Sequence, residues 1–153
     1  MQLLTFKFIK LLIRLQFPNV KEITTKELAQ LLLVSAKPRP LVLDARSQIE
    51  YAVSHIETAA QIDALIPDLA VLSTVSKDRP IVVYCAVGYR SAKLAQQLNE
   101  TGMKCIYNLS GGIFHWANEG RLIFKDDQST QVVHPYNAIW GKLLKARYHA
   151  QEH

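Results

Sequence analysis

The chain has 153 residues, 49% hydrophobic and 20% charged, which is the ordinary make-up of one globular domain with short extensions. Its net charge of +5 comes from the two ends, because residues 21–120 carry ten basic and ten acidic side chains. A nucleic-acid-binding protein would carry basic residues on its folded body among aromatic ones, so nucleic acid is not an expected partner. Two cysteines, Cys85 and Cys105, with no secretory signal ahead of them, indicate free thiols in a reducing, cytoplasmic compartment.

The first 17 residues, MQLLTFKFIKLLIRLQF, are predicted to form an amphipathic helix with Lys7, Lys10 and Arg14 on one face. An uninterrupted apolar stretch of the roughly 20 residues that cross a bilayer is absent. The charges run through the apolar region and no small-residue cleavage site follows, so a cleaved signal peptide is not expected. Two interpretations stay open: the helix packs on the domain or on a partner chain, or it lies peripherally on an anionic membrane surface.

Helix and strand signals alternate from residue 18 to residue 120. Capping boxes at Thr24 and Ser47, each with a glutamate three residues later, mark two helix starts. The predicted helices lie within 24–36, 47–55, 67–75, 91–102 and 111–120, and the predicted buried strands lie within 40–44, 80–85 and 104–109. This alternation predicts an α/β domain over 18–120, with a parallel sheet covered by helices on both faces.

The segment 121–153 is predicted to be an extension of that domain. KDDQST is typical of a polar loop, HPYN of a turn, and AIWGKLLKARYHA of a basic amphipathic helix. We expect this C-terminal helical extension to pack beside the N-terminal helix of residues 1–17, which would bring the two basic ends together.

A candidate site lies in YCAVGYRSAK, residues 84–93. Ligands bind at the carboxyl ends of the strands in open α/β sheets, and Cys85 follows the apolar run IVVY. The loop of Ala86, Val87, Gly88 and Tyr89 gathers unpaired backbone N–H groups at a helix N-terminus, a setting that favours an anion. A thiolate would be stabilised there, so Cys85 is a candidate nucleophile. A buried structural cysteine is the alternative interpretation.

Other polar side chains reach the same edge. Arg90 is expected to assist the thiolate and an incoming anion, and Ser91 opens the following helix. Asp44 and Arg46 follow the first buried strand and are expected to support the site, with an Arg46–Glu50 ion pair as the structural alternative.

The remaining candidates carry weaker signals. Cys105 lies inside a strand pattern and is expected to be a packed core sulfur. His55, His115 and His134 have no metal-site spacing, and no phosphate-binding or dinucleotide motif occurs, so neither a metal nor an organic cofactor is expected.

Three ordered segments make residues 20–120 resemble a single rhodanese (sulfurtransferase) domain. They are LVLDARSQIEYAVSHIETAAQI, IVVYCAVGYRSAKLAQQLNETG with its Cys-x-x-Gly-x-Arg-Ser pattern, and NLSGGIFHWANEG. The first departs from the family at Ser54, where glycine is usual, and at Glu57-Thr58-Ala59, where Pro-Gly-Ala is usual.

This resemblance implies a two-step, covalent sulfur transfer. Cys85 would attack the outer sulfur of a small anionic donor such as thiosulfate and become a persulfide. A nucleophilic acceptor, cyanide or a thiol, would then take that sulfur. The persulfide would be held by the loop residues Ala86, Val87, Gly88, Tyr89, Arg90 and Ser91.

Two rival functions stay open. A phosphatase or arsenate reductase of the same fold is disfavoured because its loop runs Cys-x5-Arg, whereas Cys85 and Arg90 form Cys-x4-Arg. An inactive or carrier rhodanese module, binding a partner chain or a membrane surface through its basic termini, is the second rival.

Overall fold

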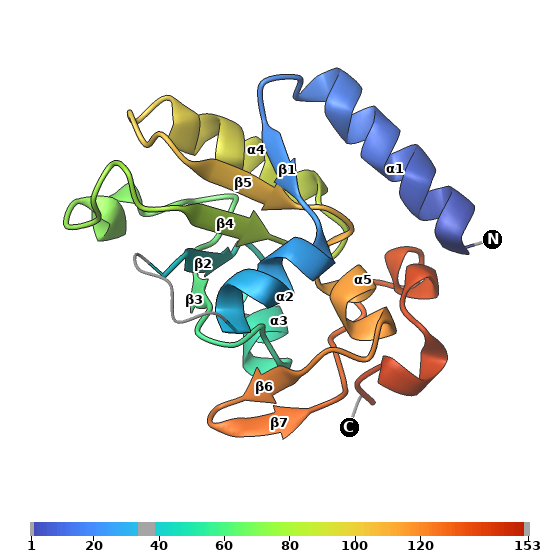
Figure 1. The fold of residues 1–153 in the computed structure, drawn as a ribbon. Helices are drawn as coiled ribbons and strands as arrows, with labels where there is room; N and C mark the ends of the chain where they lie inside the picture. The colour runs from blue at the N-terminus through green and yellow to red at the C-terminus, as the bar shows by residue number, and fades with distance from the viewer. Residues whose placement is uncertain (1, 34–38, 152–153) are drawn as a thin grey trace.

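The computed structural model describes residues 2–33 and 39–151, which form a five-stranded parallel sheet with helices on both faces (Figure 1). In spatial order the strands are β1 (Lys21–Ile23), β5 (Ile106–Leu109), β4 (Ile81–Tyr84), β2 (Leu41–Asp44) and β3 (Ala60–Gln61). The predicted α/β class is confirmed, and β2, β4 and β5 are the three predicted strands. β1 and β3 escaped prediction because three and two residues are too short to show a period.

Helices cover the two faces of this sheet and enclose two apolar clusters (Figure 1). The described helices are α1 (Gln2–Gln16), α2 (Thr25–Leu33), α3 (Gln48–Val53), α4 (Tyr89–Asn99), α5 (Gly112–Asn118) and the 3-10 helices η1 (Leu69–Leu72), η2 (Trp140–Leu143) and η3 (Ala146–Tyr148). On one face α2 and α5 pack against Val42 and Val82, and on the other α4 packs against Ile81 and Val83. Because β4 is buried on both faces, its carboxyl end is a rigid anchor for the loop that follows.

Both predicted capping boxes are present. The Glu27 N–H donates to Thr24 Oγ1 at 3.1 Å, and the Thr24 N–H donates back to Glu27 Oε1 at 3.2 Å. Ser47 and Glu50 make the same reciprocal pair at the start of α3. Met1, residues 34–36 of the predicted helix over 24–36, and residues 152–153 lie outside the described residues.

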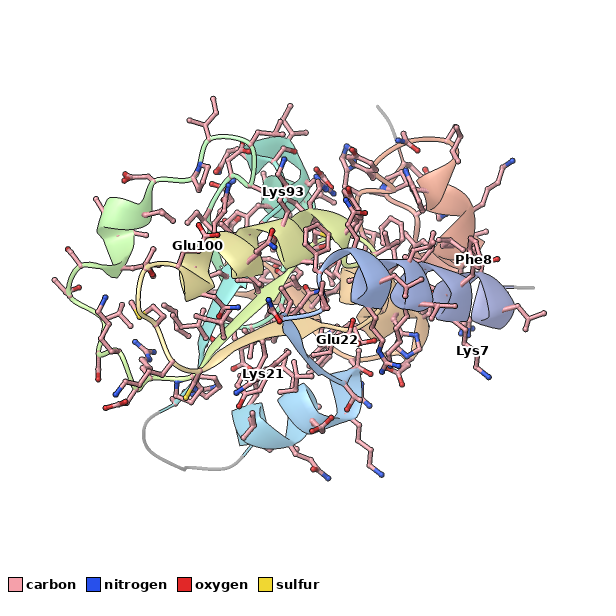
Figure 2. The ribbon with its side chains drawn as sticks, turned by 90° about the horizontal axis from the view of Figure 1, so that it is seen from above. Lys7, Phe8, Lys21, Glu22, Lys93 and Glu100 are labelled. Atoms are coloured by element: carbon pink, nitrogen blue, oxygen red, sulfur yellow. The ribbon has the colours of Figure 1, made fainter. Side chains whose placement is uncertain are left out.

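Helix α1 is present as predicted, and it packs on the domain. Ile9, Ile13 and Phe17 are buried in the core cluster, whereas Phe8 and Leu11 are exposed. The helix also lies beside η2, as expected for the two basic ends (Figure 1). Lys7 on α1 and Lys93 on α4 are exposed (Figure 2). None of the described helices has the length and apolarity needed to cross a membrane.

The structure corrects two predictions for the C-terminal segment. The predicted polar loop is the turn of an antiparallel hairpin, β6 (Ile123–Lys125) and β7 (Gln128–Thr130). The predicted amphipathic helix is replaced by η2 and η3, with an extended break at Leu144. Asn118 of α5 explains the break, because its side chain accepts from the Lys145 N–H at 2.8 Å and donates to the Leu143 carbonyl at 2.8 Å. These two hydrogen bonds take the place of backbone hydrogen bonds that a continuous helix would make at Leu143 and Lys145.

The turn between α3 and β3 shows how the departures from the rhodanese pattern are accommodated. Thr58 adopts a left-handed conformation with φ 64°, a conformation that favours glycine. The Ser54 hydroxyl donates to the Val132 carbonyl at 2.6 Å, which ties this turn to the C-terminal segment. The departures at Ser54 and at Thr58 therefore do not prevent the chain from returning to the sheet at β3.

Candidate functional site

Cys85 lies directly after β4, at the carboxyl edge of the sheet, as the sequence predicts. The side chain is buried, with 1% of its surface exposed. Its Sγ accepts a hydrogen bond from the Gly88 N–H at 3.1 Å and lies 3.3 Å from the Ser91 hydroxyl. Gly88, with φ 113°, caps α4 in a left-handed conformation, so the chain turns around the sulfur within three residues.

The backbone of this loop is oriented by the start of α5. The Ile113 N–H donates to the Cys85 carbonyl at 2.9 Å, and the Phe114 N–H donates to the Ala86 carbonyl at 3.1 Å. In a trans peptide the N–H points opposite to the preceding C=O, so the Ala86 and Val87 N–H groups point away from α5. The first-turn N–H groups of α4 also lack helical acceptors. Together these donors can surround one anionic atom.

Gly112 fixes the distance between α5 and the loop. A Cβ at this position would lie 2.4 Å from the carbonyl oxygens of both Cys85 and Ala86, and the backbone has φ 62°. Replacing Gly112 with alanine must therefore displace the loop. If the displaced loop loses the contacts of the Gly88 N–H and the Ser91 hydroxyl with the sulfur, each worth about 1 kcal/mol, alkylation of Cys85 by iodoacetate should slow about tenfold or more.

Gly120→Ala is the matched control for Gly112→Ala. It shares the left-handed backbone, φ 76°, but its added Cβ would have open space, with Tyr148 Oη 3.9 Å away. Peptide mapping of the alkylated cysteine measures both variants. Equal rates in the two variants would mean that backbone strain, and not the packing of Gly112 against the loop, controls Cys85.

Behind the sulfur, the predicted site residue Ser91 pairs with Asn108, a buried residue that the sequence analysis did not single out. The Ser91 hydroxyl lies 2.6 Å from Asn108 Oδ1, and Asn108 Nδ2 donates to the Gly88 carbonyl at 3.0 Å. Ser91 has one hydroxyl proton, so it can donate to Asn108 while accepting from a thiol, or turn to donate to a thiolate. The one signal for Asn108 was a polar residue inside the buried strand IYNL.

The Arg90 guanidinium is held in place at the mouth of the site. It forms a bidentate pair with Glu50, at 2.8 Å and 2.9 Å, and lies over the Tyr136 ring, 4.1 Å from its centroid. Burial alone would raise the pKa of Glu50, but the hydrogen bonds and charge of Arg90 outweigh it and lower that pKa. Burial alone would lower the pKa of Arg90, yet Glu50 and the nearby Cys85 raise it.

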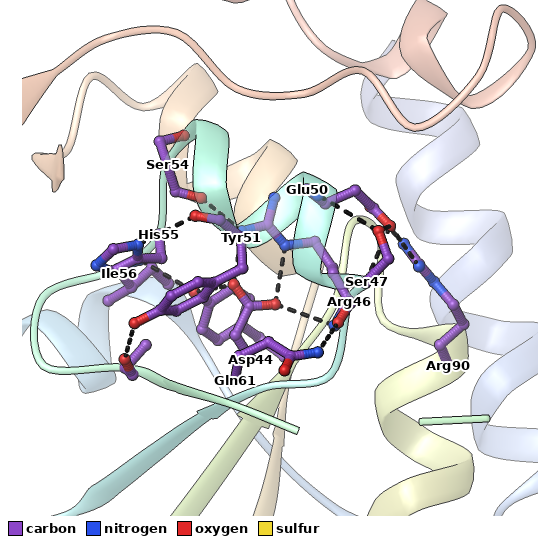
Figure 3. Close-up of polar contacts among 12 residues, drawn as sticks. Asp44, Arg46, Ser47, Glu50, Tyr51, Ser54, His55, Ile56, Gln61 and Arg90 are labelled. Carbon is purple, nitrogen blue, oxygen red and sulfur yellow. Dashed lines mark hydrogen bonds and ion pairs between the residues drawn. The ribbon is translucent and has the colours of Figure 1, made fainter. Parts of the chain in front are cut away.

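Asp44 and Arg46 form a buried network (Figure 3). Neither side chain lines the cavity in front of Cys85. Arg46 Nε and Nη2 contact the Asp44 carboxylate at 2.9 Å and 2.6 Å, and Nη2 also donates to the Ser54 carbonyl at 2.6 Å. The Tyr84 hydroxyl donates to the same carboxylate at 2.7 Å. The alternative Arg46–Glu50 pair is wrong, because Glu50 pairs with Arg90. The network fixes the turn that leads into α3, which carries Glu50.

Cys105 lies outside the site and, although the predicted strand over 104–109 includes it, outside the observed strand β5. Strand β5 begins at Ile106, one residue later, and Cys105 is half-buried. The expectation of a packed core sulfur is therefore wrong, because the side chain is only half-buried. Within 2–33 and 39–151, no three His, Cys, Asp or Glu side chains are grouped to hold a metal ion.

A cavity of about 590 Å³ opens in front of Cys85. Its floor is the loop, including Ala86 and Val87, and its walls come from the two ends of the chain. Helix α1 contributes Leu12 among other side chains, and the C-terminal segment contributes Trp140. Sequence reasoning predicted that these ends lie side by side, but not that they border the site.

A central parallel sheet, helices on both faces and a cysteine loop after the middle strand β4 define a protein of the rhodanese fold. The chain belongs to the Rhodanese-like domain family, which matches residues 24–119. The resemblance inferred from the three sequence segments is therefore confirmed. The matched range contains Cys85 and its loop, and it leaves α1 and the C-terminal segment outside.

The chain is similar to proteins whose names give different functions. It is 33% identical over 89 residues to a tRNA uridine(34) hydroxylase of Photorhabdus laumondii, a match that covers 55% of this chain and 25% of the relative. A rhodanese-like domain protein of Staphylococcus aureus is 34% identical, with TM-score 0.56 and coverage of 66% and 95%. A thiosulfate sulfurtransferase of Pseudomonas aeruginosa shares the fold, at 18% identity and TM-score 0.65, over 89% of this chain and 26% of that one.

Proposed function

We propose that this protein transfers a sulfane sulfur from a donor to a nucleophilic acceptor through a persulfide on Cys85. The observation that carries this proposal is the geometry around Sγ, where the Gly88 N–H donates at 3.1 Å and the start of α4 supplies further N–H groups. An anionic sulfur attached to Cys85 would be surrounded by fixed donors that need no reorganisation during the reaction.

In the first step the Cys85 thiolate attacks the outer sulfur of the donor. A new S–S bond forms to Sγ, the old bond to that sulfur breaks, and the leaving group keeps the electron pair, as sulfite does when thiosulfate is the donor. In the second step cyanide or a thiolate attacks the outer persulfide sulfur and regenerates the Cys85 thiolate. Atoms and charges balance without an oxidant or reductant, because sulfur moves only between nucleophiles.

Each loop residue has a role in this proposal. The N–H groups of Ala86 to Ser91 hold the persulfide anion, and the Ser91 hydroxyl, 3.3 Å from Sγ, turns toward whichever form of the sulfur is present. Glu50 fixes the position of Arg90 at the mouth and balances its charge, so Arg90 acts in this proposal through the N–H groups that Glu50 does not engage.

A phosphatase or arsenate reductase is less well supported by this site. A multiply charged tetrahedral oxyanion needs an unpaired cation beside it, but the charge of Arg90 is balanced by its bidentate contact with Glu50. The loop is also one residue shorter than the Cys-x5-Arg pattern. The match covers only 25% of the tRNA uridine(34) hydroxylase, so the similarity does not support hydroxylation by this chain.

Intact-mass measurement tests the proposal directly. After incubation with a sulfane-sulfur donor, we expect the protein to gain the mass of one sulfur atom, to lose it when cyanide is added, and to release one equivalent of thiocyanate. A mass that stays unchanged with every donor would support the inactive binding module instead. Hydrolysis of an aryl phosphate without any sulfur uptake would support the phosphatase.

A further inference from the structure

The cavity over Cys85 is an apolar chamber with the reactive sulfur at its floor. The side chains of Ile9, Leu12 and Ile13 line it from α1, and Trp140 lines it from η2. Its volume of about 590 Å³ lies in the range of sites that enclose a small organic molecule. An inorganic ion would fill only a small part of this space.

The charges around the cavity also disfavour a small, multiply charged ion. Among the residues that the structure describes, the titratable side chains that line the cavity are Cys85, Tyr89, Arg90 and Tyr136. The Arg90 charge is neutralised by the bidentate contact with Glu50, at 2.8 Å and 2.9 Å. A dianion such as thiosulfate would therefore lose its water shell among apolar side chains without meeting an unpaired cation among the described lining residues, which is costly.

Exposed apolar side chains at the rim of the cavity also favour a ligand with an apolar group. Leu12 is 47% exposed and Trp140 is 36% exposed, although both face the cavity. A bound apolar group would cover them and remove that surface from water. The wall is also tied to the loop, because Gln16 Nε2 of α1 donates to the Tyr89 hydroxyl at 2.9 Å.

From this cavity we infer that the preferred sulfur donor carries a single charge and an apolar body, as alkyl and aryl thiosulfonates do, and is taken in preference to thiosulfate. This inference rests on the proposed sulfur transfer. The Cys85 thiolate attacks the outer sulfur of R–SO2–S⁻, the S–S bond to the sulfonyl sulfur breaks, and R–SO2⁻ leaves with the electron pair. The apolar group R occupies the chamber while the sulfane sulfur lies in the loop.

The test is a series of donors that differ only in R. Methane-, butane- and benzenethiosulfonate and thiosulfate are compared by thiocyanate formation at one cyanide concentration, with protein-free rates subtracted. Each kcat/KM is divided by the rate of the same donor with free cysteine. Since each of the three extra methylenes favours binding about three- to fourfold when buried, butanethiosulfonate should exceed methanethiosulfonate roughly thirty- to sixtyfold, and thiosulfate should be the poorest donor.

Two variants of neighbouring residues show where the preference arises. Leu12→Gln places an amide in the chamber and should lower the butane-to-methane ratio about fivefold. Leu11→Gln is the matched control, because Leu11 is 52% exposed on the same helix but does not line the cavity. Trp140→Gln changes the opposite wall of the cavity and should also lower the butane-to-methane ratio.

The two proposals fail in different ways. If no donor adds sulfur to Cys85, the proposed function is wrong. If donors add sulfur but the butane-to-methane ratio stays near one, or thiosulfate is the best donor, sulfur transfer stands and the inferred donor class is wrong. An equal fall of the ratio in Leu12→Gln and Leu11→Gln would also overturn the inference.

Discussion

Cys85→Ser is expected to take up no sulfur and to release no thiocyanate with any donor. The serine hydroxyl is a weak nucleophile without an adjacent base, and among residues 2–33 and 39–151 no histidine, aspartate or glutamate lines the cavity to supply one. We expect the rate to fall at least about a thousandfold, to the limit of detection. The measurement is the intact mass after donor addition, together with thiocyanate formation.

Cys105→Ser is the matched control for this loss. Cys105 is half-buried just before β5 and is not among the cavity residues, so its removal should leave sulfur uptake unchanged. Sulfur uptake retained in Cys85→Ser and abolished in Cys105→Ser would contradict the assignment of the nucleophile. The folded state of Cys85→Ser should persist, because the Gly88 N–H and the Ser91 hydroxyl can hydrogen-bond a serine oxygen.

The parts of the fold predicted from sequence are those fixed by local signals. Capping boxes at Thr24 and Ser47 give two helix starts, and the apolar run before Cys85 gives the central strand and its loop. These features depend on residues within a few positions of one another, so one sequence is sufficient to predict them.

The parts that escaped prediction depend on distant partners. Glu50 and Arg90 are 40 residues apart, and their contact decides whether the arginine is available to a substrate. Asn118 interrupts the predicted C-terminal helix from a separate helix. The same holds for the cavity, whose walls come from both ends of the chain and whose apolar character no local pattern could indicate.

Arg46→Met should lower the free energy of unfolding by about 3–5 kcal/mol, because it leaves the buried Asp44 carboxylate without its cation. Arg46 and Asp44 are fully buried, and the guanidinium also donates to the Ser54 carbonyl at 2.6 Å. Burial alone would lower the pKa of Arg46, but Asp44 outweighs it and raises that pKa, so the arginine stays charged. Urea unfolding at neutral pH measures the change.

Arg46→Lys should also be destabilised, because one ammonium group cannot make the contacts that Nε and Nη2 make with Asp44 and Ser54. Lys93→Met is the surface control and should change stability by less than about 0.5 kcal/mol, because Lys93 is exposed on α4. The double variant Asp44→Asn with Arg46→Met should recover part of the stability, since it removes the unpaired charge. A single Arg46→Met variant as stable as Lys93→Met would show that the pair contributes nothing, and that α3 keeps its position by apolar packing alone.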